Sequence, residues 1–316
     1  MKPIAFVFPG QGSQSVGMLD AWGDHPAVRD TLQEASDALG EDVGALIANG
    51  PKEDLALTTN TQPVMLVAGV AAWRAWRAEG GALPAAVAGH SLGEYSALVA
   101  AGALALADAV PLVRLRARAM QEAVPVGAGA MAAILGLDAS KVIAGCAEVT
   151  SAMGPNGTEV VEAVNFNDPV QTVIAGTKAA VEKACDVLKG MGAKRALPLP
   201  VSAPFHSSLM KPAAERLKAA LADVAFATPQ IPVVNNIDVA IEDEAGRIRD
   251  ALYRQAFGPV RWVECIRKVK AMGLHTVVEC GPGKVLAGMT KRIDAELTGV
   301  AMYDPATLAE VKAQVS

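Results

Sequence analysis

The chain has 316 residues, of which 52% are hydrophobic and 4% aromatic, and its net charge is −5. This length suggests about two domains with a substantial apolar core, and the abundance of small side chains favours a closely packed α/β architecture. The longest apolar run, at 97–107, is too short to span a bilayer. The negative charge offers no general attraction for nucleic acid. We therefore expect no membrane span and no nucleic-acid binding.

Cysteine usage and the N-terminal segment bear on cofactors and location. The four cysteines lie far apart, at positions 146, 185, 265 and 280. They form no C-x-x-C pair and have no histidine at ligand spacing, so neither a metal site nor a disulfide framework is expected. The N-terminal apolar run at 4–8 is too short for a signal peptide. The sequence predicts a cytoplasmic protein.

The first part of the chain alternates between strand and helix patterns. The expected elements are strand 4–8, helices 26–39 and 62–78, a weak strand 85–90, and helices from Leu92 and over about 106–123. The first strand ends in a glycine-rich loop, GQGSQSVG, and Pro63 is expected in the first turn of the second helix. This order is typical of an α/β fold with a parallel sheet.

The pattern changes after Gly127. The expected elements there are strand 129–135, helix 138–149, strands 159–165 and 170–175, helix 177–191 and strand 194–199. Their βαββαβ order is typical of a ferredoxin-like domain. After residue 200 the earlier pattern returns, with a strand at 274–279, the turn GPGK and a further helix. We predict a discontinuous catalytic subdomain, 1–126 and 200–316, and an inserted ferredoxin-like subdomain, 127–199, with the site in the cleft beside the insert.

Two glycine motifs do not complete a nucleotide-binding signature. In GPGK at 281–284, the Walker pattern would need a glycine where Glu279 stands and a serine or threonine where Val285 stands. Gly10-Gln-Gly12 follows a strand, but position 15 is serine, so no G-x-G-x-x-G forms. Nucleotide binding by either motif is not expected.

The stretch VAGHSLGEYSALVAAG at 87–102 places Ser91 between two glycines, where a strand is expected to turn into a helix. The G-x-S-x-G spacing fits a nucleophile elbow, in which glycines at 89 and 93 allow close packing around a strained serine. A serine before an apolar helical run is also a common helix N-cap. The motif alone leaves both interpretations open.

A serine nucleophile needs a base, and the chain has four histidines. His90 adjoins Ser91, so its side chain should point to the other side of the strand. His25 precedes a helix and His275 opens a strand, positions typical of surface or core residues. His206, in the loop VSAPFHSSLM, lies downstream of the serine as in hydrolases, and it is the candidate base.

Several motifs together resemble one acyltransferase family, the malonyl-CoA:acyl carrier protein transacylases. They are FPGQGSQ at 8–14, NTQP at 60–63, GHSLGEYSAL at 89–98, Arg116 with Met-Gln-Glu at 120–122, NFN at 165–167, SAPFHSSLMKPA at 202–213 and GPGKVL at 281–286. The resemblance extends over about 4–293, in the family's motif order. It implies a hydrolase-like large subdomain with a nucleophile elbow and a ferredoxin-like small one.

The resemblance also implies catalytic roles. Ser91 would accept the acyl group, and His206 would serve as general base and then as acid for the leaving thiol. The backbone N–H groups of Gln11 and Leu92 would form the oxyanion hole. No acidic residue stands in an obvious triad position. The backbone carbonyl of Gln255 would instead orient the base, giving a dyad.

A malonyl group ends in a carboxylate, for which arginine offers a planar bidentate partner. Arg114, Arg116 and Arg118 alternate along one expected helix. At 100° per residue, Arg116 falls next to the apolar stripe and the other two fall near Gln121. Periodicity and the family motif both favour Arg116 for the carboxylate. Weaker candidates for lining the acyl pocket are Gln11, Gln62, Asn165 and, before the base, Phe205.

The implied reaction passes malonyl from malonyl-CoA to Ser91 and then to the phosphopantetheine thiol of an acidic acyl carrier protein, without a metal or redox cofactor. Fatty acid and polyketide synthesis remain alternative settings, and a serine hydrolase or a catalytically inactive binding domain remains an alternative function. Lys291 and Arg292 are our candidates for a basic patch that docks the carrier. The other basic clusters, 194–195 and 267–270, resemble solvated faces.

Overall fold

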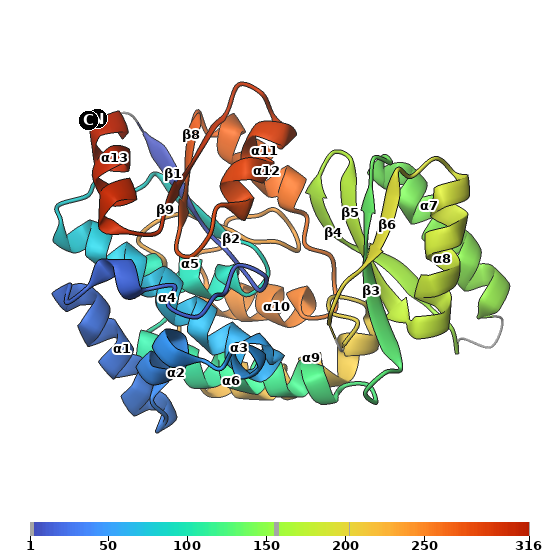
Figure 1. Cartoon of the computed structure of the whole chain (residues 1–316), viewed down its shortest axis with the longest axis horizontal. Helices are drawn as coiled ribbons and strands as arrows, with labels where there is room; N and C mark the ends of the chain where they lie inside the picture. Colours follow the sequence, from blue (N-terminus) through green and yellow to red (C-terminus); the bar gives the residue numbers. More distant parts are fainter. Residues whose placement is uncertain (1–2, 155–157, 202, 316) are drawn as a thin grey trace.

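The chain builds two sheets that lie in separate parts of the molecule (Figure 1). The computed structural model describes residues 3–154, 158–201 and 203–315. One sheet has five parallel strands in the order β7-β2-β1-β8-β9, and the other has four strands in the order β4-β5-β3-β6. The predicted α/β fold with a second, antiparallel subdomain is confirmed. The boundaries 1–126, 127–199 and 200–316 remain our proposal.

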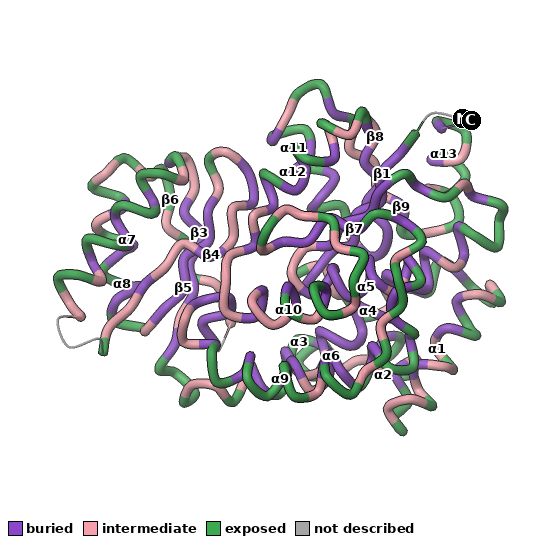
Figure 2. The backbone as a smooth tube through the Cα atoms, turned by 180° about the vertical axis from the view of Figure 1, so that it is seen from behind, coloured by how far each residue is buried: buried purple, intermediate pink, exposed green. Residues whose placement is uncertain are grey.

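The parallel sheet forms the centre of the larger part. Its strands are β1 (Ile4–Phe8), β2 (Ala86–Gly89), β7 (Val233–Val234), β8 (Thr276–Cys280) and β9 (Thr298–Met302). Every residue of β1 is buried, as expected for a central strand covered on both faces. The buried positions in Figure 2 follow β1, β2, β7 and β8, whereas the edge strand β9 is mostly half-buried and helices at the edge of the molecule alternate between buried and exposed positions.

The helices of the larger part cover both faces of this sheet or pack on the helices that do. They are α1 (Pro26–Leu39), α2 (Val43–Asn49), α3 (Lys52–Ala56), α4 (Thr58–Ala78), α5 (Gly93–Ala100), α6 (Leu106–Glu122), α9 (Lys211–Asp223), α10 (Ala245–Gln255), α11 (Trp262–Ala271), α12 (Val285–Ile293) and α13 (Pro305–Val315). Two apolar clusters result, with Phe6 and Phe8 of β1 in the one and Ala5 and Val7 in the other. Alternate residues of β1 thus enter opposite cores, which fixes the register of the strand.

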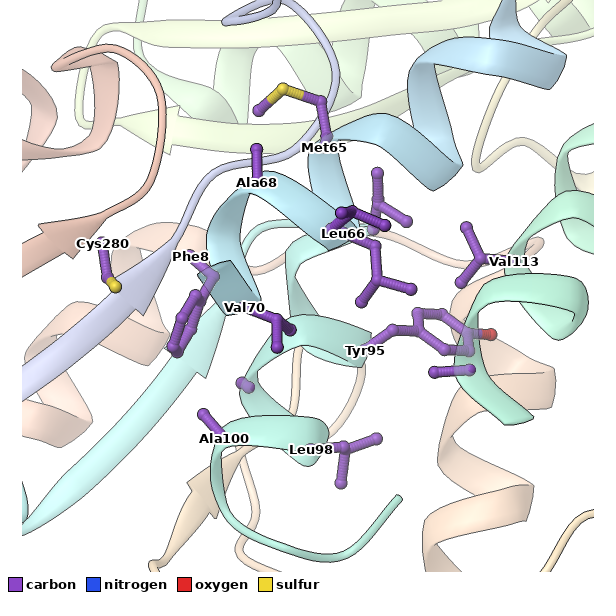
Figure 3. Packing of buried hydrophobic residues seen from close by; sticks show 14 of the residues in the cluster. Phe8, Met65, Leu66, Ala68, Val70, Tyr95, Leu98, Ala100, Val113 and Cys280 are labelled. Carbon is purple, nitrogen blue, oxygen red and sulfur yellow. The ribbon is translucent and has the colours of Figure 1, made fainter. Parts of the chain in front are cut away.

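Helix α4 passes through the larger core and is buried along most of its length. Leu66 and Val70 of α4 lie close to Tyr95 and Leu98 of α5 (Figure 3). Gly69 faces the ring of Phe8, where an added Cβ would lie 3.4 Å from Cδ1. Small residues in α4 therefore let the helix lie against both β1 and α5.

The smaller part contains β3 (Gly129–Leu135), α7 (Ala139–Met153), β4 (Val161–Asp168), β5 (Gln171–Thr177), α8 (Lys178–Gly190) and β6 (Arg195–Pro198). Its strand order is that of a ferredoxin-like domain. Ala132 and Ile134 of β3 face the core under α7 and α8, whereas Met131 and Ala133 belong to the core of the larger part. The second face of this sheet is therefore buried only because the larger part covers it.

Most predicted elements agree with the structure to within a few residues, but the start of α4 was predicted wrongly. Pro63 is the sixth residue of this helix and not part of its first turn. The helix starts earlier because the polar turn at 58–61 is held in place by tertiary contacts. Thr61 Oγ1, for example, donates a hydrogen bond to the carbonyl oxygen of Leu55, at 2.7 Å.

Candidate active site

The segment after β2 turns sharply and presents Ser91 from a strained backbone. Ser91 has a φ of 52°, in the left-handed region that favours glycine. A Cβ on Gly89 would lie 1.8 Å from the carbonyl carbon of Gly93, and one on Gly93 would lie 2.1 Å from the carbonyl oxygen of Phe8. Both glycines are thus required for the close approach of β1, β2 and α5. This is the geometry of a nucleophile elbow.

Asn236, just after β7, braces the elbow from behind. Its Oδ1 accepts a hydrogen bond from the backbone N–H of Ser91 at 2.7 Å, and its Nδ2 donates to the carbonyl oxygen of Gly89 at 2.8 Å. This residue was not predicted from the sequence. The only local signal was an Asn-Asn pair after a short apolar run, which does not indicate a partner more than a hundred residues away.

Ser91 and His206 are hydrogen-bonded to each other. Ser91 Oγ lies 2.7 Å from Nε2 of His206, and the His206 Nδ1 lies 2.9 Å from the backbone carbonyl oxygen of Gln255. Because a carbonyl only accepts, Nδ1 carries the proton and Nε2 is left as the acceptor. The serine O–H therefore points at a basic nitrogen, the arrangement needed to activate a serine nucleophile.

His206 is held in its neutral form. The side chain is 4% exposed, and burial together with the nearby Arg116 lowers its pKa from 6.5 to about 3. Burial has this effect because it penalises the charged imidazolium, and the guanidinium repels the same charge. The imidazole is consequently available as a base throughout the neutral pH range.

Arg116 of α6 reaches the same site and is 2% exposed. Its guanidinium donates hydrogen bonds to Gln62 Oε1 at 2.5 Å, to Gln255 Oε1 at 3.1 Å and to Ser91 Oγ at 3.2 Å. The bond to Ser91 occupies a lone pair of the hydroxyl oxygen, which leaves the hydroxyl proton for His206. All three partners are uncharged. A buried cation with neutral partners is well suited to receive an anionic substrate group.

The other two arginines of α6 lie elsewhere. Arg118 is exposed, as the periodicity predicts. Arg114, which the periodicity places near Gln121 and away from the apolar stripe, is nevertheless buried, and both of its terminal nitrogens are bonded to the Glu41 carboxylate, at 2.8 and 3.0 Å. Glu41 lies between α1 and α2, whose coverage of α6 could not be inferred from helical periodicity alone.

A cavity of about 420 Å³ opens beside Ser91, between the two parts of the molecule. The predicted site residues that line it are Gln11, Gln62, Ser91, Leu92, Arg116, Asn165, Phe205 and His206. Gln255 stands behind them and contacts the site through its hydrogen bonds. Asn165 Oδ1 is buried and has no hydrogen-bond partner in the described part of the chain, which leaves it free to accept from a bound group. Ser202, in the motif containing the base, lies outside the described residues.

The two residues whose backbone N–H groups were predicted to form an oxyanion hole line the same cavity, although Leu92 directly follows the nucleophile and Gln11 follows the neighbouring strand β1. Leu92 immediately precedes α5, whose first residue is Gly93. Over the ranges that the structure describes, neither the N–H of Leu92 nor that of Gln11 donates to another group. Both remain available to an oxygen in the cavity.

The remaining histidines have structural contacts. His90 Nε2 lies 2.8 Å from Asn167 Oδ1, its ring packs 5.4 Å from that of Trp262, and burial lowers its pKa. His25 accepts a hydrogen bond from the backbone N–H of Ala27 and caps α1. In the described residues, no cluster of histidine, cysteine and acidic side chains could hold a metal ion. The described helices also include none with the length and apolarity to cross a membrane.

Comparison with known proteins gives consistent matches over almost the whole chain. The acyl transferase domain family matches residues 5–304. The chain is 54% identical over 315 residues to the malonyl CoA-acyl carrier protein transacylase of Salmonella typhimurium, covering 99% of this chain and 100% of that protein. It is 46% identical over 309 residues to the Bacillus subtilis protein of the same name, covering 98% of this chain and 96% of that protein.

Solved structures agree with these matches. An acyl-carrier-protein S-malonyltransferase from Burkholderia pseudomallei is 64% identical, with a TM-score of 0.95 and coverage of 99% of this chain and 100% of that one. A malonyl-transacylase in complex with a type II PKS acyl-carrier protein is 50% identical, with the same TM-score and coverage.

The elbow geometry predicts that Gly93→Ala destabilises the fold. The added Cβ would meet the Phe8 carbonyl oxygen of the central strand, so we expect the free energy of unfolding to fall by at least about 2 kcal/mol. Urea denaturation measures it. Gly246→Ala is the control, because nothing lies within 4 Å of a Cβ at that exposed helical position. Similar stability of the two variants would contradict the close contact.

The buried neutral His206 predicts a pH-dependent contribution to stability. Its native pKa of about 3 lies below 6.5, so the unfolded chain binds more protons between these values and stability should fall as pH decreases. Between pH 7 and pH 5, wild type should lose about 2 kcal/mol more unfolding free energy than His206→Asn. His275→Asn, at an exposed position, is the control. Equal losses in wild type and His206→Asn would mean that the native imidazole is protonated at pH 5.

Proposed function

This chain belongs to the acyl transferase family, and on that premise we propose that it transfers a malonyl group from malonyl-CoA to the phosphopantetheine thiol of acyl carrier protein. One observation carries the proposal beyond the family. Ser91 Oγ lies 2.7 Å from the His206 base and 3.2 Å from the buried Arg116 guanidinium. A nucleophile and a cation so close together suit a short acyl group with a carboxylate at its far end.

In the first half-reaction, the hydroxyl oxygen of Ser91 attacks the thioester carbonyl of malonyl-CoA while His206 Nε2 takes the hydroxyl proton. The resulting oxyanion is held by the N–H groups of Leu92 and Gln11. Collapse of this tetrahedral intermediate breaks the C–S bond, and His206 gives its proton to the departing CoA sulfur. The product is a malonyl ester of Ser91.

The second half-reaction runs the same chemistry with a different thiol. The phosphopantetheine thiol of the carrier protein gives its proton to His206 and attacks the ester carbonyl. The proton then passes to Ser91 Oγ as the C–O bond breaks. No metal or redox group takes part in this proposal, because every proton is moved between Ser91, His206 and the two thiols.

The acyl pocket explains the proposed preference for malonyl. Arg116 would replace its hydrogen bond to Ser91 Oγ with bonds to the substrate carboxylate, while Gln62 continues to hold the other end of the guanidinium. On the opposite wall, Asn165 Oδ1 has no hydrogen-bond partner among the described residues and can accept a hydrogen bond from an N–H or O–H donor of the substrate. Phe205 lines the cavity beside the base, where its ring would limit the room for a branched acyl group.

The pathway and location are part of the proposal. We place the enzyme in the cytoplasm, where it would supply malonyl for fatty acid synthesis. Polyketide synthesis is the second candidate, because one similar structure is a malonyl-transacylase with a type II PKS carrier. A thioesterase for neutral acyl groups is disfavoured, because its acyl pocket would contain a buried, unneutralised guanidinium.

The proposed ester predicts a covalent adduct. Intact-protein mass spectrometry after mixing with malonyl-CoA should show one malonyl group on wild type and none on Ser91→Ala. Ser96→Ala is a matched control, because Ser96 is buried on α5 and its hydroxyl has no partner among the described residues. An adduct on the Ser91→Ala protein would mean that another residue is the nucleophile.

Removal of the carboxylate partner should change substrate selection. Arg116→Ala should lower kcat/KM for malonyl-CoA by about 2–5 kcal/mol in transition-state terms, because a desolvated charge loses its partner. The kcat/KM for neutral acetyl-CoA should fall little. Arg118→Ala, two residues along the same helix and exposed, is the control. Equal losses on both substrates would mean that Arg116 supports catalysis or folding in general.

Carrier docking through the basic patch on α12 predicts a selective effect of charge reversal. Arg292 Nε is bonded to Asp168 Oδ2 at 2.8 Å, so changing it would also unpair a buried carboxylate, and exposed Lys291 is the cleaner position. Lys291→Glu should slow malonyl transfer to the carrier protein and make that transfer less dependent on salt. Acylation of the enzyme by malonyl-CoA should stay unchanged. Lys183→Glu on α8 makes the same charge change at another exposed position. Identical carrier kinetics in the two variants would exclude Lys291 from docking.

A further inference from the structure

A buried carboxylate lies under the nucleophile elbow and takes no part in the proposed proton transfers. Glu94 is the second residue of α5, three positions after Ser91, and it is 2% exposed. Its Oε2 accepts hydrogen bonds from the backbone N–H of Asn236 at 2.9 Å and from Gln255 Nε2 at 3.0 Å. Burial raises the pKa of Glu94 to about 7, and Arg116 acts in the opposite direction.

The Gln255 side chain joins this carboxylate to the acyl pocket. Its Nε2 donates to Glu94 Oε2 and to the carbonyl oxygen of Ser91, at 3.0 and 2.9 Å, while its Oε1 accepts from Arg116 at 3.1 Å. A reversed amide would place its oxygen against two acceptors and its NH₂ against the guanidinium. The contacts therefore fix which end of the amide faces Arg116, and Glu94 supplies one of the two acceptors that do so.

This orientation matters because few hydrogen bonds aim Arg116. Gln62 holds one terminal nitrogen, and the second is shared between Gln255 and Ser91, while the guanidinium packs 5.6 Å from the centre of the Tyr95 ring. Within residues 3–154, 158–201 and 203–315, no carboxylate lies within ion-pair distance of the Arg116 guanidinium, although the buried Glu94 carboxylate attracts it from farther away, and its Nε has no hydrogen-bond partner. Gln255 and Gln62 are thus the two residues whose side-chain amide oxygens hold the guanidinium beside the nucleophile in the described hydrogen bonds.

We infer that Glu94 is a positioning residue for substrate selection, which holds the Gln255 amide in the orientation that aims Arg116 at the substrate carboxylate. The inference rests on the proposed malonyl transfer and names a further residue for it. Glu94 touches neither Ser91 Oγ nor the imidazole in the described hydrogen bonds, and its hydrogen-bonded path to Arg116 runs through Gln255. Its charge also attracts the guanidinium directly, an effect that Glu94→Gln removes while it keeps the hydrogen-bonded path.

The alternative is a purely structural role, since Glu94 also accepts from the backbone of Asn236, which braces the Ser91 backbone. The two roles differ in substrate dependence. Loss of the brace would disturb Ser91 and lower the reaction of every acyl group, whereas loss of the Arg116 orientation would lower the reaction of malonyl alone. The ratio of kcat/KM for malonyl-CoA to that for acetyl-CoA separates them.

The experiment measures this ratio for release of CoA by wild type, Glu94→Ala, Glu94→Gln, Gln255→Ala and the double variant Glu94→Ala/Gln255→Ala. Glu94→Ala should lower the ratio at least about tenfold, the effect of one hydrogen bond to a charged group. Glu94→Gln keeps an oxygen that can accept from Gln255 and should recover most of the ratio. Gln255→Ala keeps the backbone carbonyl that orients His206, and it should lower the ratio as Glu94→Ala does.

The double variant tests whether both residues act through one path. If they do, its ratio equals that of Gln255→Ala, because Glu94 has nothing left to orient. Three outcomes would each overturn the inference. The ratio of the double variant could fall by the product of the two single effects, kcat/KM could fall equally for malonyl-CoA and acetyl-CoA, or the Glu94→Gln ratio could be as low as that of Glu94→Ala. Should Glu94→Ala fail to fold, Gln255→Ala must still lower the ratio and Glu94→Gln must not.

Malonyl transfer by the wild-type protein separates a failure of this inference from a failure of the proposed function. Wild-type protein that does not transfer malonyl to carrier protein refutes the function, and the inference with it. Wild-type transfer together with an unchanged ratio in the folded Glu94→Ala protein refutes the role of Glu94 alone.

Discussion

The contact between the α5 backbone and the central strand is the constraint on which the site depends. Gly93 lies so close to the Phe8 carbonyl oxygen that a side chain does not fit, and this contact forces the left-handed turn at Ser91. The same turn brings the Ser91 hydroxyl to His206, and in the described part of the chain the N–H of Leu92 donates to no other group. The proposed nucleophile and the proposed oxyanion donor thus depend on one packing requirement.

The parallel sheet determines what can surround this turn. Strands β1, β2 and β7 run in the same direction, so Gln11, Ser91 and Asn236 all follow the carboxyl ends of neighbouring strands. Ligand sites form at such edges in open α/β sheets because several loops meet there. The inserted ferredoxin-like part then adds the opposite wall through residues such as Met131 and Asn165. The cavity exists because residues of both parts of the molecule line it at this edge.

Local patterns were enough to predict the features that local physics determines. The strand 4–8 was predicted with its correct bounds because its apolar run is uninterrupted. The helix 26–39 was also predicted with its correct bounds, because it begins with a proline and has a clear helical period. Helical periodicity placed Arg116 beside the apolar stripe, where it is buried, but it gave no sign that Arg114 is buried too. The positions of Ser91 and His206 were inferred from motif spacing, chain order and family resemblance, and their chemical roles remain proposals.

The features that escaped prediction depend on contacts between distant segments. The two-residue strand β7 has too little sequence to show a period, yet it places Asn236 under the elbow. Glu94 follows the serine in a motif that reads as an apolar helix, and only the packing of α10 against α5 shows that its carboxylate has partners. Arg114 looks solvent-exposed until the segment that carries Glu41 is placed over it.

Arg116 illustrates why contacts from distant segments surround a buried charge. Its guanidinium is buried and held by neutral amide and hydroxyl oxygens, which replace only part of its hydration. That incomplete compensation has a cost in stability, and it suits Arg116 to the substrate carboxylate that we propose it binds. Burial lowers the pKa of His206, and the Arg116 charge lowers it further, which keeps the proposed base neutral. A single buried arginine therefore links the proposed substrate charge, the protonation state of His206 and the direction of the serine hydroxyl proton.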